Sequence, residues 1–373
     1  MGINEIIVYL MLAFAVLGAL DKMLGNRFGL GEKFEEGILA IGALSLSMVG
    51  MIVLAPVLAN VLSPVVVPVF ELIGADPGMF AGCILANDMG GAPLADALAQ
   101  SGEAGAFGGL IVGSMLGATL VFTIPAALGI IKKEDRSFFA MGILSGVITI
   151  PVGAFVGGLA AGYPVSMILK NLTPIVIMAV LVALGLLFAQ GAMITGFTVF
   201  GKGVVVLVTF GLIAGIVEKL TGKVILPGAN PIGEGFAVVA DIAIVLAGAF
   251  PLVHVLTKVL KKPLAALGRL LGINEASVAG MIASLANNIP MFGLMKDMNP
   301  RGKVVNAAFA VSAAFVFGDH LGFTAGYAKE MIVPVIVGKL TGGITAVAVA
   351  VLFTTTKKFK EMEKGEGKVE EAV

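Results

Sequence analysis

The feature that most constrains this chain is a series of apolar stretches, most of them close to the ~20 residues that cross a bilayer as a helix. Hydrophobic residues make up 58% of the sequence and charged residues only 13%, which excludes an ordinary soluble domain. The 51 glycines favour closely packed helices over a β-barrel. We therefore expect an all-α polytopic membrane protein with about nine full spans, at 3–20, 37–62, 105–131, 138–162, 173–189, 198–217, 236–257, 304–323 and 331–353.

Two further apolar stretches, 78–99 and 276–295, carry polar and helix-breaking residues at their middles. The first contains Asn87 and Asp88 just before two glycines, and the second contains Asn287 and Asn288 just before a proline. Unwound backbone at membrane depth is tolerated only where protein or a water-filled cavity satisfies its N–H and C=O groups. These stretches are therefore predicted to be broken or re-entrant helical hairpins that face the interior.

Basic residues predict the orientation of the chain. With nine spans and two hairpins, eighteen lysines and arginines fall on one side of the membrane and four on the other. Basic residues concentrate in cytoplasmic loops, so we expect a multi-pass protein of a bacterial cytoplasmic (inner) membrane with its C-terminal tail in the cytoplasm. The charged tail, 354–373, is predicted to be disordered. The first stretch lacks a basic leader and a cleavage site, so we interpret it as a span rather than a signal peptide.

An internal repeat is predicted within a single transporter domain, 1–353. Shifting the chain by 198 residues aligns glycines and aliphatic residues of approximately 37–131 with those of 236–330, including Gly74 with Gly272. Two inserted residues then bring Asn87-Asp88 onto Asn287-Asn288. Apolar sequences align easily, which is the competing explanation. Interrupted helices at corresponding positions of inverted halves are typical of the binding site of a secondary transporter.

The polar residues at the breaks are the first candidates for substrate binding: Asp88, Asn87, Asn287 and Asn288. The alternative is that they only cap the half-helices that follow them. The two breaks together hold one formal negative charge and no lysine or arginine. That balance favours a small monocation or a neutral polar solute over a carboxylate.

Further ionisable residues fall in or beside the spans, where they are costly and usually face a pathway or a partner. Asp319 and His320 are adjacent, and we treat both as candidates for the site; the alternative is an interfacial pair. His254 and Asp241 are better explained as interfacial or satisfied residues. Lys339 lies deep in the last span, where an acid such as Asp319 or Asp241 could pair with it.

Signatures of soluble enzymes are missing from the sequence, which has no HExxH, no G-x-S-x-G, no P-loop and no C-x-x-C. We therefore expect no cofactor, no metal, no ATP-driven pump and no enzyme. A membrane-embedded enzyme that uses Asp319 and His320, or Asp241, as acid and base stays open as an alternative.

Several segments are specific enough to indicate a family. They are MGINEII at the start, FEEG (34–37), MVGM (48–51), LAPVLA (54–59), DMGG (88–91), LANNIPMFG (285–293), RGKVVNAAFAVSAAF (301–315) and GDHLGF (318–323). Together they resemble the ethanolamine permease of bacterial ethanolamine-utilization operons (EutH family), over nearly the whole chain to Phe353. The resemblance implies uptake of ethanolamine through the cytoplasmic membrane, followed by its cleavage in the cell by a cobalamin-dependent lyase.

The implied substrate suits the candidate residues. Protonated ethanolamine carries an ammonium donor and a hydroxyl group, so its site needs one carboxylate together with amides and carbonyls. Asp88, with Asn87, Asn287 and Asn288, would supply that set, and Phe292 could add a cation-π face, although packing is the commoner role of such a residue. Facilitated diffusion and alternating access both stay open. So do a sodium- or proton-coupled carrier of another polar solute and assembly as a homo-oligomer.

Overall fold

The computed structural model describes residues 2–357, 359–361 and 363. All regular elements in these residues are helical, which confirms the all-α class, and eight helices are long and apolar enough to cross a membrane. The eight are α1 (Ile3–Met23), α2 (Leu30–Leu72), the run Gly102–Ile130, the run Arg136–Ala160, α9 (Val165–Phe188), α10 (Gln190–Thr221), α11 (Ile232–Leu271) and the run Lys329–Phe353. The runs contain α5 (Gly102–Ala106), η2 (Phe107–Gly117), η3 (Thr119–Thr123) and α6 (Ile124–Ile130), then α7 (Arg136–Val147) and α8 (Ile150–Ala160), and finally η5 (Lys329–Met331) and α16 (Ile332–Phe353).

The ninth predicted span, 304–323, is not one helix. It divides into α14 (Pro300–Ala313) and α15 (Asp319–Tyr327). Between them Phe315 adopts a positive φ of 59°, and the N–H groups of Phe315 and Phe317 donate to the carbonyls of Ser284 and Leu285, both at 2.9 Å. The helix therefore stops because its backbone pairs with another broken segment, and the prediction of a continuous span here was wrong.

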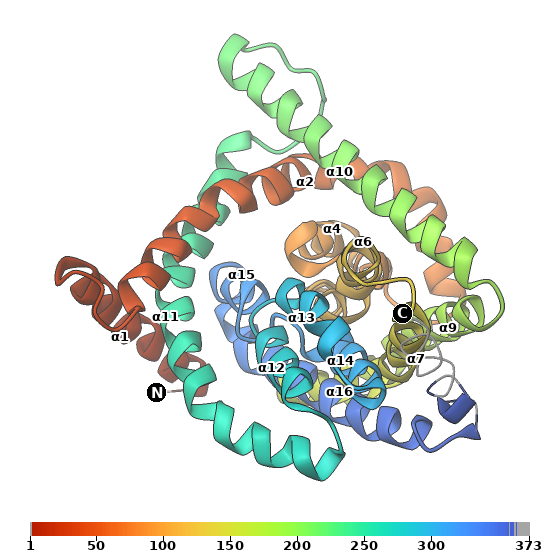
Figure 1. Cartoon of the computed structure of the whole chain (residues 1–373). Helices are drawn as coiled ribbons and strands as arrows, with labels where there is room; N and C mark the ends of the chain where they lie inside the picture. Colours follow the sequence, from red (N-terminus) through yellow and green to blue (C-terminus); the bar gives the residue numbers. More distant parts are fainter. Residues whose placement is uncertain (1, 358, 362, 364–373) are drawn as a thin grey trace.

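Long helices border the molecule. Figure 1 shows α2, α10 and α11 curving around a group of shorter helices that includes α4 (Gly91–Leu98), α12 (Glu275–Ser284), α13 (Asn288–Leu294) and α15. α2 has 43 residues and α11 has 40, about twice the length that crosses a bilayer. Both contain internal prolines, three in α2 and two in α11, which remove helical hydrogen bonds and permit bends. α2 and α11 pack on each other along much of their lengths.

The run Gly102–Ile130 lies almost wholly inside the protein. Part of it is wound as a π-helix, η2, and glycines let neighbouring backbones approach it closely. A Cβ on Gly82 would lie 1.8 Å from the carbonyl oxygen of Gly108, so only glycine fits there. This close packing of α3 (Met79–Ile84) against η2 fixes the position of the first interrupted stretch.

Each interrupted stretch returns to the place where it began. The first comprises α3, η1 (Asn87–Met89) and α4 (Gly91–Leu98), and the N–H of Gln100 donates to Asp76 Oδ2 at 3.1 Å. The second comprises α12 (Glu275–Ser284), α13 (Asn288–Leu294) and η4 (Met295–Asp297). Asn274 Nδ2 donates to the Asp297 carbonyl at 2.8 Å, and Asn299 Nδ2 donates to the Gly272 carbonyl at 3.0 Å. The side chains at the two ends of each stretch thus hold those ends together.

The predicted tail stays on the bundle at its beginning. Phe359 is buried and packs edge-on against Phe138 of α7, with ring centroids 6.0 Å apart. The chain therefore does not leave the bundle at Phe353. Residues 364–373 of the predicted disordered tail lie outside the described residues.

Candidate functional site

The first break places Asp88 on the short turn η1. α3 ends at Ile84, and Gly90 then adopts a φ of 95°, which a residue with a side chain rarely takes. A Cβ on Gly90 would also lie 1.8 Å from Met51 of α2, so the turn is held tightly against that helix. The Asp88 side chain is 17% exposed, which leaves its carboxylate mostly buried but reachable.

A chain of ionisable side chains leads inward from Asp88. His320 Nε2, on α15, lies 3.8 Å from Asp88 Oδ1, which is longer than a direct hydrogen bond. His320 Nδ1 lies 3.0 Å from Lys339 Nζ of α16, and Lys339 also donates to the backbone carbonyl of Ser114 on η2. Two parts of the chain that are distant in sequence, η1 with η2 and α15 with α16, therefore meet at one acid, one imidazole and one amine.

Lys339 and His320 are both deeply buried. The ring of Phe315 lies against His320, with centroids 5.0 Å apart, and covers one face of the imidazole. A buried amine is tolerated when an opposite charge and hydrogen-bond acceptors compensate for lost hydration. The structure supplies Asp88 beyond His320 as that charge, whereas Asp241, one of the acids considered from the sequence, is exposed on α11.

Asn87 and Asn288 are fully buried, one in each break. Asn288 Nδ2 donates to Thr123 Oγ1 at 3.2 Å, and its oxygen has no hydrogen-bond partner among the described residues. Neither side-chain polar atom of Asn87 has a partner within this part of the chain. Leaving a buried polar group unpaired costs roughly 1 to 3 kcal/mol, so these atoms are suited to a ligand or to water.

Asn287 has a structural role. It is the N-cap of α13, and its side-chain oxygen accepts the N–H of Ile289 at 2.8 Å. The capping explanation considered from the sequence therefore applies to Asn287. Neither Asn87 nor Asp88 caps α4 in this way, because the N-cap position there is Gly90.

The remaining residues considered from the sequence are Asp319, Phe292 and His254. Asp319 begins α15 beside His320, half-buried and near enough for its charge to act on Asp88. Phe292 is buried in the apolar core and packs edge-on against Phe139, with centroids 6.0 Å apart. His254 lies beside the Gly29 turn, with its Nε2 3.4 Å from where a Cβ of Gly29 would stand.

Sequence reasoning missed two groups at this site. They are the Ser114 carbonyl and Thr123. Lys339 itself was visible as a deep lysine, but its neighbour Ser114 comes from a segment 225 residues away in the chain. The Ser114 carbonyl has no sequence signal at all, because its availability depends on the path of η2. Thr123 was also missed, since a threonine inside an apolar run is usually explained by a hydrogen bond to its own helix.

The arrangement can bind a small cation that also forms hydrogen bonds. Asp88 and His320 offer a carboxylate and an imidazole within 3.8 Å of each other. The buried amides with unpaired atoms belong to Asn87 of the same turn and to Asn288 of the second break. Within the described residues, no three His, Cys, Asp or Glu side chains are grouped as a metal site would need.

Comparison with known proteins gives full-length matches. Residues 3–353 match the family model described as "Ethanolamine utilisation protein, EutH". The chain is 60% identical to a probable ethanolamine permease EutH of Listeria monocytogenes, covering 100% of this chain and 99% of the relative. Proteins given the same description in Salmonella typhimurium and Escherichia coli K12 are 51% and 50% identical, each over 94% of this chain and 96% of the relative. No solved structure matches.

Proposed function

We propose that this chain, which belongs to the EutH family of ethanolamine utilisation proteins, carries ethanolamine across a bacterial membrane. The observation that carries the proposal is the match over essentially the full length to relatives described as probable ethanolamine permeases. Eight helices of membrane-spanning length and composition fit this role. Family membership favours a transporter over the membrane-embedded enzyme considered from the sequence.

The substrate ammonium binds the carboxylate of Asp88 in this proposal. A charge-assisted hydrogen bond to a mostly buried carboxylate is stronger than one between neutral groups, and it selects a cation. The hydroxyl group of ethanolamine both donates and accepts a hydrogen bond, which suits the unpaired amides of Asn87 and Asn288. Asn287 contributes through the shape of the second break, and Phe292 through packing beneath it.

Lys339 limits how tightly the cation is held. Its amine lies on the far side of His320 from Asp88, so a bound ammonium and Lys339 share one buried carboxylate between them. A carrier needs binding strong enough for entry and weak enough for release. The shared carboxylate meets this need. His320, placed between an acid and an amine, could also pass a proton, which is the observation in favour of proton-coupled uptake.

The finer architecture that we propose is an inverted repeat with two re-entrant hairpins. Gly74 and Gly272, which end α2 and α11, have φ values of 72° and 70°. A Cβ on Gly117 would lie 1.8 Å from the Leu85 carbonyl oxygen, and one on Gly318 would lie 2.1 Å from that of Ala286. These parallel contacts support the repeat.

The register that these contacts support differs by one residue from the sequence alignment. Matching Leu85 to Ala286 and Gly117 to Gly318 sets Asn87 opposite Asn288 rather than Asn287. The two fully buried asparagines then become the equivalent pair.

The membrane topology stays a proposal, with Lys132 and the residues after Phe353 in the cytoplasm and Gly102 outside. Contacts between segments that are predicted to lie on the same side of the membrane support this topology. Lys303 forms a buried ion pair with Asp135 at 2.7 Å, and at the opposite side Asn4 donates to the Glu330 carbonyl at 2.7 Å. A homo-oligomer also stays a prediction. The exposed apolar faces of α1 and α10 do not require a second copy of the chain, because lipid is enough to cover them.

Cysteine labelling tests the topology. Cys83 is buried, and its replacement by alanine gives a background for single cysteines at the exposed positions Lys132 and Gly102. An impermeant maleimide added to intact cells should label Gly102→Cys and leave Lys132→Cys unlabelled until the cells are opened. Labelling of Lys132→Cys from outside would contradict the orientation.

Uptake tests the function. Purified protein in liposomes should accumulate or equilibrate radiolabelled ethanolamine faster than protein-free liposomes, and excess unlabelled ethanolamine should suppress the signal. Imposed proton and sodium gradients, applied separately, distinguish facilitated diffusion from coupled transport. A protein that carries no ethanolamine under any gradient would contradict the proposal.

A further inference from the structure

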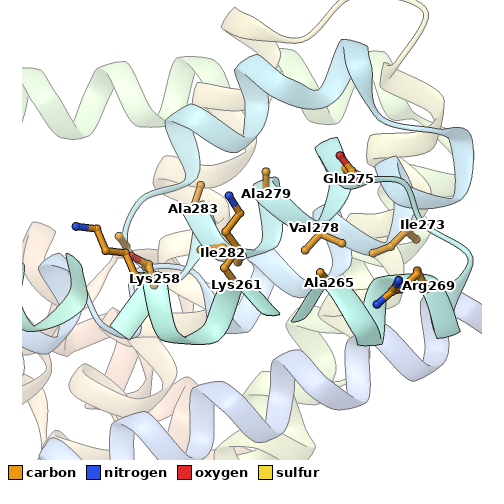
Figure 2. A pocket seen from close by; sticks show the side chains of 12 residues that line it. Lys258, Lys261, Ala265, Arg269, Ile273, Glu275, Val278, Ala279, Ile282 and Ala283 are labelled. Carbon is orange, nitrogen blue, oxygen red and sulfur yellow. The ribbon is translucent and has the colours of Figure 1, made fainter. Parts of the chain in front are cut away.

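A pocket of about 800 Å³ lies between α11 and α12, away from Asp88 and its neighbours. Figure 2 shows basic side chains along α11 on one wall, and small or branched apolar side chains of α12 on the other. The basic side chains are Lys258, Lys261 and Arg269. We propose that this pocket binds an anionic phospholipid, with its headgroup lying along the row of these three residues, whose charges attract the phosphate, and its acyl chains along α12.

The basic residues share one face of α11. Lys258, Lys261 and Arg269, together with Ala265, follow the three-to-four-residue spacing that puts side chains on the same side of a helix. All three cationic side chains are exposed, and Glu275 is the single acid of the lining. The pocket therefore carries an excess of positive charge, which matches a phosphate.

The opposite wall is apolar and smooth. Ala279 and Ala283 are accessible on α12, with Val278 and Ile282 beside them in the lining. Accessible alanines next to branched side chains form a shallow surface on which an acyl chain can lie. A free phosphate or a soluble anion would make no use of this wall.

The predicted depth of the pocket in the membrane also suits a lipid headgroup. α11 has 40 residues, roughly twice what the hydrocarbon core needs, so part of it must extend to the level of the headgroups or beyond. The lining residues of α11 all fall in its second half, on the side that the basic-residue distribution predicts to be cytoplasmic. Basic pockets between helices on that side are suited to anionic lipid headgroups.

A substrate pathway is the competing occupant. The pocket reaches Ala286, the residue next to the second break, so water could use it to approach the interior. Three cations in the lining would repel protonated ethanolamine, however, and they would attract a lipid phosphate. The charge therefore favours the lipid.

Native mass spectrometry of the purified full-length chain in detergent tests the proposal. Dioleoyl phosphatidylglycerol is titrated against the parent and against the triple variant Lys258→Gln/Lys261→Gln/Arg269→Gln. Each basic residue near a membrane surface contributes a factor of about five in affinity, so the triple variant should bind roughly a hundredfold more weakly. The matched control, Lys132→Gln/Lys133→Gln/Lys262→Gln, removes three exposed lysines outside the pocket and should bind like the parent.

A second variant tests the apolar wall without touching the charges. Ala279→Leu fills the surface beside α12 and should also weaken phosphatidylglycerol binding several-fold. Phosphatidylcholine and glycerol phosphate complete the set of ligands. Equal binding of phosphatidylcholine would indicate a general lipid contact, and equal binding of glycerol phosphate would indicate an anion site. Either result, or undiminished phosphatidylglycerol binding by the triple variant, would overturn the proposal.

Ethanolamine affinity, measured in detergent without added lipid, separates the lipid site from a substrate pathway. The triple variant should bind ethanolamine like the parent, because its substitutions lie outside the Asp88 cluster. If the triple variant gains ethanolamine affinity while lipid binding is unaffected, the pocket is a substrate vestibule and the lipid assignment is wrong.

Discussion

At both breaks, backbone carbonyl groups at the interruption accept hydrogen bonds, but the donors and the role of the nearby side chains differ. At the second break, the carbonyls of Ser284 and Leu285 accept N–H groups from the segment after α14, and Asn287 caps α13. At the first break, the Ala86 carbonyl accepts the N–H groups of Met89 and Gly91, so the turn satisfies itself. Backbone pairing at the first break therefore does not require the side chains of residues 87 and 88.

This difference suggests separate roles for the two breaks: polar side chains at the second break stabilise the fold, whereas those at the first break are available for substrate recognition. The polar side chain of Asn287 at the second break caps the start of α13. At the first break, Asp88 points toward His320, and Asn87 is buried without a partner among the described residues. Asp88 does not cap the following helix, and the amide of Asn87 has no partner among the described residues, so both side chains are available to a substrate. We therefore propose that ethanolamine is recognised mainly at the first break.

Of the variants that test the difference between the two breaks, Asp88→Asn should have the largest effect, a loss of ethanolamine affinity. The substitution keeps the size of the side chain and removes the negative charge of the first break. A lost charge-assisted hydrogen bond is worth on the order of 1.5 to 3 kcal/mol, so ethanolamine affinity should fall roughly ten- to over a hundredfold. Equilibrium binding of labelled ethanolamine to purified protein measures the change.

Asn287→Ala is the control for this variant, because it alters the second break without changing charge. Its ethanolamine affinity should stay within a few-fold of the parent. If Asp88→Asn binds and carries ethanolamine like the parent, Asp88 has no part in recognition, and Asp319 becomes the leading carboxylate.

Two glycines test whether the breaks are built alike. Gly117→Ala and Gly318→Ala would each place a methyl group about 2 Å from a backbone carbonyl oxygen, at the first and second break respectively. Such overpacking costs about 1 to 3 kcal/mol, and rigid backbone puts both near the upper end. Thermal unfolding in detergent should show similar losses for the two variants.

Gly129→Ala and Gly293→Ala are matched controls, because each lies in a helix with open space where the methyl would go. Alanine there should leave the melting temperature unchanged or raise it slightly. A large loss at Gly117 and none at Gly318 would mean that the two breaks are held differently, and it would weaken the case for a repeat.

Lys339 tests how the charge at the first break is balanced. Lys339→Met should destabilise the protein, since it removes the amine that compensates Asp88, and it should slow ethanolamine release more than it slows binding. In the double variant with Asp88→Asn, part of the lost stability should return. Groups in one network couple by roughly 0.5 to 3 kcal/mol, which a double-mutant cycle of melting data can detect. Additive effects would show that Lys339 and Asp88 act independently.

Much of this architecture is visible in the sequence, because apolar length and interrupting residues are local signals. The eight spans follow from runs of apolar residues, and both breaks follow from Asn, Asp, Gly or Pro inside such runs. The break after α14 has no comparable signal. Its sequence, AFVFG, is apolar, and it leaves the helix because Phe315 and Phe317 find carbonyl partners on another segment. Tertiary hydrogen bonds decide that boundary.

The sequence singles out the acid and amides of the candidate site, but it does not reveal how they are arranged. Asp88 and Asn87 stand out as polar residues in an apolar stretch. Which asparagine of the second break is their counterpart depends on backbone contacts, and sequence alignment was one residue away from the register we propose. The pairing of Lys339 with His320 also depends on how α15 and α16 come together, which sequence spacing does not reveal.

The smallest expected effects are those of Asn87→Ala and Asn287→Ala, which should differ in whether stability or uptake is lost. Asn287→Ala removes a helix cap and should cost about 1 kcal/mol of stability, with uptake of ethanolamine retained. Asn87→Ala should change stability little, since the small cavity it creates is offset by removing a buried amide that has no protein partner among the described residues. Its ethanolamine uptake should fall several-fold, because the amide is lost as a partner for the substrate hydroxyl. Melting curves and uptake rates measured on the same two preparations decide between these roles. If Asn87→Ala melts as early as Asn287→Ala while its uptake is unchanged, Asn87 supports the fold, and the hydroxyl group must be recognised from the second break, where Asn288 has the remaining unpaired oxygen.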